Sequence, residues 1–212
     1  MAIISAITAQ QNNKERCNIF IDGEYKFALS LELVLKNRLK VGLEISEQRI
    51  EEMLLESEKS TALSKVAKYV STALKTKKQI KDYLAKKGYC QQTIYYCIDK
   101  LKEYGYINDV NFSLRYIESV YTKQGKRLIE SKLMQKGVCK QDIEQAFIQF
   151  EEQTKENDNI EDAFSVAKNI AQKYIRNKEI TKENIAKTYR YLIGKGFSYE
   201  QASVAIEQFK EE

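Results

Sequence analysis

The sequence predicts a mainly α-helical protein of three tandem three-helix repeats, preceded by a small N-terminal α/β extension that contains a β-hairpin. Three observations predict this fold. The 212 residues include no proline and only eight glycines, so the chain has few obligatory helix breaks. A Lys-Gly pair recurs three times, with apolar residues at matching distances on both sides. Near the N-terminus, an Asp-Gly pair separates two runs of β-prone residues.

The N-terminal extension is expected to span residues 1–58 and to begin with strands. Asp22-Gly23 is typical of a two-residue hairpin turn, and it lies between Cys17–Ile21 and Tyr25–Leu29. Ile3–Ile7 can supply a third strand. Two serines then predict short helices. Ser30 is a candidate cap for a helix that ends near Val41-Gly42, and Ser46 for one that contains Ile50, Met53 and Leu54.

The three Lys-Gly pairs predict helix ends of the same type. A leucine precedes each glycine by four residues, and an apolar or aromatic residue follows it directly. This spacing predicts a Schellman turn, in which a glycine of positive φ closes the helix and its apolar neighbours make contact. The structural glycines are Gly88, Gly137 and Gly196, with leucines Leu84, Leu133 and Leu192 before them and Tyr89, Val138 and Phe197 after them.

A second helix is expected after each turn, because apolar residues recur 6, 10 and 13 positions beyond the glycine. That spacing places them on one helical stripe, and the small residues 9 positions beyond the glycine widen it. The members of the stripe are Ile94, Ile98 and Leu101, then Ile143, Phe147 and Phe150, then Ala202, Ile206 and Phe209, with Cys97, Ala146 and Ala205 as the small residues.

Another helix is expected before each pair, at Leu63–Leu74, Val110–Tyr121 and Ile160–Tyr174. Asp158 with Glu161 resembles a capping box for the last of these. The third repeat also has a longer run before its glycine, which includes Asn177–Thr181. The predicted repeats occupy residues 59–108, 109–154 and 155–212.

The composition argues against an enzyme. Without histidine, the chain can form neither a Ser-His-Asp nor a Cys-His nucleophile system, and it has no histidine metal ligand. The four cysteines show no CxxC spacing, and no phosphate-binding glycine loop occurs. We therefore expect no catalytic residues, no cofactor and no metal. With neither a signal-like N-terminus nor a long apolar run, a cytoplasmic protein without membrane contact is expected.

Basic residues gather in the first two predicted repeats. Thr61–Cys90 contains eight lysines and one acid, Asp82, whereas Glu144–Asp162 is strongly acidic. Such clusters can attract a nucleic-acid backbone or an acidic protein filament, although single lysines usually serve only to solvate a helix. The candidate partner-binding residues are Lys75, Lys77, Lys78, Lys81, Lys86, Lys87, Arg115, Lys123, Lys126 and Arg127.

Two other groups of residues leave alternatives open. The helix–glycine turn–helix unit can also be a helix-turn-helix that acts directly on DNA, with Gln91, Gln92 and Tyr95 facing the bases. A scaffold for an acidic protein, without nucleic acid, is a third option. Cys90 and Cys139 occupy equivalent positions in separate repeats, and we interpret both as structural.

Several motifs, in their order along the chain, resemble the RecX family. They are Tyr83–Tyr89 with its Leu-Ala-Lys-Lys-Gly core, Gly105–Phe112, which is similar to a Gly-Tyr-Leu-Asp-Asp-x-x-Phe signature, and Gly125–Val138. The resemblance covers residue 61 to the C-terminus, and the hairpin extension is similar to that of longer members from Gram-positive bacteria. Two positions differ: Asn108 replaces an acid, and lysines with Thr76 replace an arginine-rich run before the first turn.

The resemblance implies three three-helix units in a curved, elongated monomer without enzymatic activity. It also implies a regulator, mainly an inhibitor, of the recombinase RecA in DNA repair, recombination and the SOS response. Such a protein binds along the groove of the RecA filament on single-stranded DNA. There it modulates ATP hydrolysis, strand exchange and coprotease activity. Contact with single-stranded DNA itself is expected to be weak or to pass through RecA.

Overall fold

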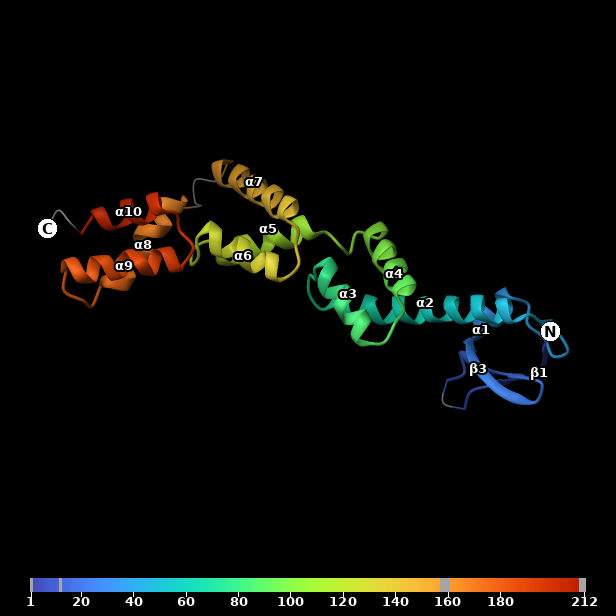
Figure 1. Ribbon diagram of the computed structural model, residues 1–212. Coiled ribbons are helices and arrows are strands. Elements are labelled where there is room, and N and C mark those ends of the chain that lie inside the picture. The colour runs from blue at the N-terminus through green and yellow to red at the C-terminus, as the bar shows by residue number, and fades with distance from the viewer. Residues whose placement is uncertain (1, 12, 157–160, 210–212) are drawn as a thin grey trace. The chain divides into compact units, whose positions relative to one another are not determined.

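The computed structural model describes residues 2–11, 13–156 and 161–209. In these ranges the chain forms four short strands and ten α-helices (Figure 1). It divides into two compact units, which are described separately. One contains Met1–Ala73 with Lys81–Glu103, and the other contains Leu74–Ile80 with Tyr104–Glu212. The predicted fold class, helical repeats after a small strand-containing extension, is confirmed.

The extension is a four-stranded antiparallel sheet in the order β3-β2-β1-β4. Its strands are β1 Ala2–Ala9, β2 Arg16–Ile21, β3 Glu24–Ser30 and β4 Glu44–Ile45. Asp22 and Gly23 both have positive φ, at 50° and 86°, as a two-residue hairpin turn requires. The predicted hairpin and the third strand are therefore confirmed.

Alternate residues of the hairpin face one core, because side chains on a strand point to opposite faces in turn. Cys17, Ile19 and Ile21 of β2 are buried, and so are Phe27 and Leu29 of β3. The same cluster takes in the first part of the long helix that follows the sheet, through Met53, which is 1% exposed.

Helix α1 is shorter than predicted. It runs only from Leu31 to Lys36, although its predicted cap is confirmed, since the Leu33 N–H donates to Ser30 Oγ at 3.3 Å. The prediction that it continues to Val41-Gly42 is wrong. Asn37 Nδ2 donates to the Leu33 carbonyl at 2.9 Å, and Arg38 takes a left-handed conformation with φ 52°, so the helix cannot continue.

Helix α2 is a single element from Glu47 to Ser71, where the sequence predicted two separate helices. Ser46 is its N-cap, as predicted, and accepts the Arg49 N–H at 3.3 Å. No glycine or proline interrupts these 25 residues, so nothing in the backbone ends the helix between the extension and the first repeat. The expected boundary at residue 58 lies inside this helix; it and the other domain boundaries stay predictions.

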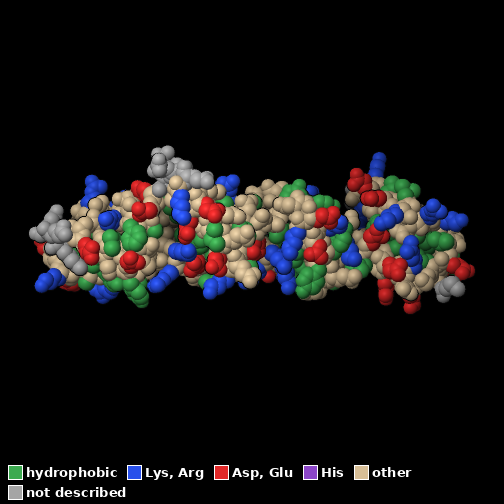
Figure 2. Space-filling view, turned by 90° about the horizontal axis from the view of Figure 1, so that it is seen from above, with side chains coloured by type: hydrophobic (Ala, Val, Ile, Leu, Met, Phe, Trp, Pro, Cys, Tyr) green, Lys and Arg blue, Asp and Glu red, His purple; other side chains and the backbone are tan. Residues whose placement is uncertain are grey.

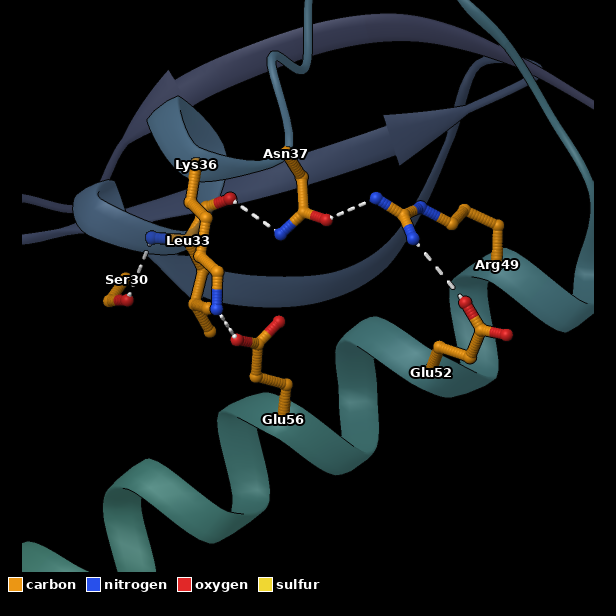
Figure 3. Close-up of polar contacts among 7 residues, drawn as sticks. All are labelled: Ser30, Leu33, Lys36, Asn37, Arg49, Glu52 and Glu56. Carbon is orange, nitrogen blue, oxygen red and sulfur yellow. Dashed lines mark hydrogen bonds and ion pairs between the residues drawn. The ribbon is translucent and has the colours of Figure 1, made fainter.

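Polar side chains fasten α1 to α2 (Figure 3). Asn37 is central, since its Oδ1 accepts Arg49 Nη2 at 2.6 Å while its amide donates to the end of α1. Arg49 also pairs with Glu52 at 3.4 Å. One helical turn farther along, Glu56 pairs with Lys36 and raises the pKa of that ammonium group. The extension is thus tied to the first part of α2 by polar contacts as well as by its core.

Three helical repeats follow. The first combines the end of α2 with α3 Lys77–Lys86 and α4 Gln91–Glu103. The second contains α5 Asp109–Val120, α6 Lys126–Gln135 and α7 Lys140–Glu156. The third contains α8 Ala163–Ile175, α9 Lys182–Gly194 and α10 Tyr199–Glu207. The predicted cap residue Asp158 lies outside the described residues; the cap that the structure describes is Asp162, which accepts the Ser165 N–H at 2.7 Å.

The three Lys-Gly turns are Schellman motifs, as predicted. The glycines Gly88, Gly137 and Gly196 have φ values of 82°, 86° and 89°. In each turn the residue after the glycine donates its N–H to the leucine carbonyl, at distances of 3.3, 3.1 and 3.2 Å. The glycine N–H bonds one residue farther along, at 3.0, 2.9 and 2.9 Å. These bonds satisfy carbonyls that the helix end would otherwise leave unpaired.

The predicted apolar stripe is also confirmed. The residues 6, 9 and 10 positions after each glycine are all buried, and the small residues Cys97, Ala146 and Ala205 are fully enclosed. In the second and third repeats the stripe packs with the first helix of the same repeat, through Ile117 in one and Ala171 in the other. Each of these repeats therefore has a core of its own.

Helix α9 differs from its counterparts. It has 13 residues, whereas α3 and α6 have 10 each. Its extra turn lies at the N-terminal end, where Thr181 accepts the Asn184 N–H through its hydroxyl group and the Ile185 N–H through its carbonyl. The longer run that the sequence showed before Gly196 is thus partly helix.

We expect replacement of the three turn glycines by alanine to lower the free energy of unfolding by different amounts. Gly88→Ala should lower the free energy of unfolding by about 1–2 kcal/mol, the cost of a left-handed alanine. Gly137→Ala should cost more and Gly196→Ala most, by roughly a further 1–3 kcal/mol. The reason is that an added Cβ meets the side chain of Lys78 at Gly137 and the Leu128 backbone at Gly196, but nothing at Gly88. Urea unfolding followed by circular dichroism measures the series; equal losses would contradict this interpretation.

Candidate functional site: basic side chains and the joints between repeats

Each turn lysine lies over a tyrosine ring. Lys87, Lys136 and Lys195 directly precede the three glycines, and their ammonium nitrogens lie 5.9, 5.6 and 5.2 Å from the ring centroids of Tyr83, Tyr116 and Tyr191. A cation over an aromatic face is attracted to it even when partly solvated. The rings thus restrict the directions in which the three lysines can point.

The turn of the second repeat docks on the start of α3, and we call this contact the first joint. Thr76 is fully buried, and its Oγ1 donates to the Lys136 carbonyl at 2.8 Å. The same hydroxyl accepts the Gln79 N–H, and Gln79 Oε1 accepts the Thr76 N–H, so the residue also forms a capping box. One side chain therefore caps a helix and links two repeats.

The turn of the third repeat docks in the same way on the start of α6, forming the second joint. Here backbone groups make the bonds: the Gly125 N–H donates to the Lys195 carbonyl at 2.8 Å and the Arg127 N–H to the Gly196 carbonyl at 3.2 Å. The unpaired N–H groups at one helix start thus satisfy carbonyls at another helix end. A Cβ on Gly125 would lie 2.4 Å from the Gly196 backbone, which explains the glycine.

The predicted basic residues of the first repeat lie on and before α3. Lys77 uses its backbone N–H to bond Asp109 Oδ1 at 2.9 Å, which leaves its exposed side chain out of that contact. Lys78 contributes its methylene groups to the first joint beside Gly137. Lys81 lies over Tyr95, 5.6 Å from its centroid. Lys86 is exposed, and Lys75 is half-buried.

The predicted basic residues of the second repeat are more dispersed. Arg115 pairs with Glu118 at 3.1 Å, and Lys126 with Glu151 at 3.4 Å, so carboxylates partly neutralise both. Arg127 lies at the second joint with its guanidinium 5.2 Å from the Tyr199 ring centroid. Lys123 is exposed and lies in a cavity with Lys173 and Lys195, two residues that the sequence did not single out.

Charges of both signs are interspersed on the face that Figure 2 shows, with apolar side chains between them. The attraction of a partner to it would therefore depend on local groups of lysines rather than on a uniform field.

Comparison with known proteins identifies the family. The chain matches the family models for the regulatory protein RecX N-terminal domain over residues 2–46, the first RecX three-helix domain over 62–101 and the third over 161–206. A regulatory protein RecX from Clostridium beijerinckii is 38% identical over 213 residues, covering 98% of this chain and 96% of the relative. The chain belongs to the RecX family.

Other members show the same relationship. A regulatory protein RecX from Clostridium tetani is 30% identical over 203 residues, covering 96% of this chain and 92% of the relative. A crystal structure of regulatory protein RecX matches with a TM-score of 0.72 and 27% identity over all of both chains. RecX from Lactobacillus salivarius, 22% identical, shares the fold with a TM-score of 0.62 over 73% of this chain and 98% of its own.

The geometry explains the RecX signature from Gly105 to Phe112. Asn108, which stands where the signature has an acid, is the N-cap of α5 and accepts the Asn111 N–H at 2.8 Å. Asparagine caps a helix about as well as aspartate, so the exchange preserves this role. Asp109 accepts the Lys77 N–H and thereby links α5 to the start of α3. The two adjacent residues therefore serve two different helix starts.

The other candidate residues have modest local roles. Gln91 Nε2 donates to the Tyr95 hydroxyl at 2.9 Å, so two of the three residues suggested for base contact bond each other. Cys139 Sγ accepts the Asp142 N–H at 3.5 Å at the start of α7, and Cys90 Sγ lies 3.3 Å from Thr93 Oγ1. Within the described ranges, no cluster of three or more metal-binding side chains occurs, and no helix is long and apolar enough to cross a membrane.

We expect Thr76→Val to destabilise the first joint. It leaves the Lys136 carbonyl and the Gln79 N–H without their hydroxyl partner, at a cost of about 1–3 kcal/mol in unfolding free energy. Thr76→Ser keeps the hydroxyl and should cost less than about 1 kcal/mol. Thermal unfolding measures both, and hydrogen exchange at the starts of α3 and α7 locates the effect. Equal stability of the two variants would refute the role given to this hydroxyl.

Cysteine reactivity should follow exposure. Burial raises the pKa of the Cys97 thiol to about 11, whereas Cys90 and Cys139 are exposed. At pH 8 the reactive thiolate is therefore scarce at Cys97. Iodoacetamide followed by peptide mass spectrometry should label Cys90 and Cys139 well before the buried Cys17 and Cys97. Early labelling of Cys97 in the folded protein would contradict this expectation.

Proposed function

We propose that this RecX-family chain regulates the recombinase RecA, mainly by inhibition, by binding along the groove of the RecA filament on single-stranded DNA. The observation that carries the proposal is the match of nearly the whole chain to proteins named regulatory protein RecX. In this function the chain modulates ATP hydrolysis, strand exchange and coprotease activity during DNA repair and the SOS response. It acts in the cytoplasm as a monomer, without an enzymatic step or a cofactor.

The joints support this mode of action. Each joint ties the turn of one repeat to a helix start of the preceding repeat, through bonds between backbone groups or a buried hydroxyl. Successive repeats can then present separate contact patches to a filament that is itself repetitive. Individually weak contacts made by linked patches strengthen one another, because the first contact raises the effective concentration of the next. We infer that binding biases the filament toward an inactive or disassembling state.

The basic residues of α3 are the proposed contact group in the first repeat. The side chains of Lys77, Lys81 and Lys86 pair with no described carboxylate. Lys78 and Arg127 also remain in the proposed binding set, but their places at the joints make them poor test positions. Lys126 and Arg115 are weaker candidates because each already has an acidic partner.

The decisive measurement is ATP hydrolysis by the recombinase of the same organism on circular single-stranded DNA, with and without this protein. The wild-type chain should lower the rate. Replacing Lys77, Lys81 and Lys86 with glutamine should raise the concentration for half-inhibition about tenfold, since each exposed charge contact contributes roughly 0.5 kcal/mol. The matched control replaces Lys140, Lys168 and Lys182 and should inhibit within about twofold of wild type.

Two outcomes would count against the proposal. An unchanged hydrolysis rate with the wild-type protein would remove the inhibitory role, and equal inhibition by both triple variants would remove the proposed surface. Binding to bare and RecA-coated strands across a salt series tests the alternative of direct action on DNA. Equal affinity for both strands, with the same steep salt dependence, would favour that alternative.

A further inference from the structure

A surface cavity of about 480 Å³ lies in the second unit beside the second joint. Three of its seven lining residues are lysines and none is acidic. The loop between α5 and α6, together with helices α8 and α9 and the turn that follows, contributes these residues, which are Thr122, Lys123, Ile170, Lys173, Tyr174, Tyr191 and Lys195.

The second joint holds two of the lysines near each other. Lys195 has its carbonyl bonded to the Gly125 N–H at 2.8 Å, and Lys123 precedes Gly125 by two residues. Lys173 reaches the same cavity from α8. The three ammonium groups thus come from three separate segments, and the joint fixes the backbone of two of them.

A tyrosine stack forms one wall of the cavity. The rings of Tyr174 and Tyr191 are nearly parallel, with centroids 4.2 Å apart and planes inclined by 17°. Cations also lie over both rings: Lys178 Nζ is 3.3 Å from the Tyr174 centroid and Lys195 Nζ is 5.2 Å from that of Tyr191. Each ring thus has the other tyrosine stacked on it and a lysine nearby, which makes the pair a poor platform for a nucleobase and holds Lys195 at the edge of the cavity.

The three lysines of the cavity have no acidic partner among the described residues. Other basic residues of this unit do: Lys126 pairs with Glu151 and Lys187 with Glu183. Three neighbouring cations without a counter-charge repel one another and attract an anion. An anion with several closely spaced charges would relieve this repulsion best.

Lysine at all three of these positions belongs to the second joint and not to joints in general. The residues equivalent to Lys123, Lys173 and Lys195 at the first joint are Leu74, Ser119 and Lys136, matched by their distances from the turn glycine and from the helix cap. Of these three matched positions, one carries a cation at the first joint and all three do at the second. Joint geometry alone does not require the two additional lysines.

We propose that this cavity binds adjacent phosphates of a single-stranded nucleic-acid backbone directly and without sequence preference. Lysine ammonium groups suit phosphate as point charges, whereas recognition of peptide carboxylates favours the two-pronged arginine side chain, which the cavity lacks. The two tyrosine rings, stacked on each other and each with a lysine nearby, are a poor platform for reading bases. This contact goes beyond regulation of RecA and does not depend on it, because it needs no recombinase.

The test is binding of a fluorescein-labelled twelve-residue thymidine oligonucleotide, followed by anisotropy over a salt series without recombinase. Lys123→Leu with Lys173→Ser gives the cavity the residues of the first joint. It should weaken binding at least about tenfold at low salt and reduce the salt slope by about 1.4, as expected for the loss of two phosphate contacts. The matched control, Lys140→Leu with Lys168→Ser, removes two charges outside the cavity and should change the affinity less than about twofold.

Two further variants separate charge from structure. Lys123→Arg with Lys173→Arg keeps both charges and should retain most of the affinity. Leu74→Lys with Ser119→Lys gives the first joint the cations of the second and should strengthen binding. Circular dichroism establishes that each variant keeps its helical content, so that a weakened affinity reflects lost contacts.

Several results would overturn the proposal. One is the absence of measurable oligonucleotide binding by the wild-type chain at low salt. Another is an equal loss of affinity in the cavity variant and its control. Competition distinguishes the source of the anion. ATP that displaces the oligonucleotide at equal phosphate concentration would indicate a free nucleotide as ligand, and equally effective polyglutamate would indicate an acidic peptide. The single variant Lys173→Ser leaves every residue of the proposed RecA-binding set in place; it should weaken oligonucleotide binding and still inhibit RecA, which separates this contact from the proposed function.

Discussion

A glycine in a left-handed conformation at the end of a helix is the element on which the repeats depend. Its geometry lets two N–H groups turn back to bond the last carbonyls of the helix, and it directs the chain into the following helix. The same turn leaves the carbonyl of the preceding lysine pointing outward. At Lys136 and Lys195 that outward carbonyl accepts a hydrogen bond from the repeat before it. Closing a helix and joining two repeats are thus done by one six-residue segment, from the leucine to the residue after the glycine.

The N-terminal extension is attached by a different principle. Helix α2 belongs to two cores, because Met53 packs with the sheet while Ala62 and Val66 are buried about two and three helical turns beyond the contact of Glu56 with α1. No turn separates the extension from the first repeat, so a change of helical phase along α2 would alter both cores. A continuous helix is a stiffer connection than a loop. It requires only that the residues between the two cores favour helix, and none of them is glycine or proline.

The turns and helix ends that could be predicted from the sequence are those that residues close together in the chain determine. The turn at Gly88 and the hairpin at Asp22-Gly23 depend on contacts within a few positions, so their spacing was sufficient. The end of α1 was missed because it depends on Arg38 in a conformation that arginine seldom adopts. The joints were missed because Thr76 and Lys136 are 60 positions apart and neither residue type by itself indicates such a hydrogen bond.

The candidate surface was predictable to a similar degree. Clusters of lysine were visible in the sequence, but the sequence did not show which lysines have an acidic partner in the fold. Lys126 pairs with Glu151, a residue 25 positions away on another helix. Lys123, in contrast, has two further lysines beside it that belong to the following repeat. Only folding decides which charges meet a partner of opposite sign, because a helix surface offers several neighbours to each side chain.

The additional N-terminal turn of α9 distinguishes the third repeat from the first two. At both joints the start of a helix donates hydrogen bonds, from backbone N–H groups or a hydroxyl, to the Lys-Gly turn of the following repeat. In α9 the residue that corresponds to Thr76 and Gly125, twelve positions before the turn glycine, is Asn184, which lies inside the helix. A designer who wished to append a repeat on the pattern of the two joints would therefore need to delete the added turn.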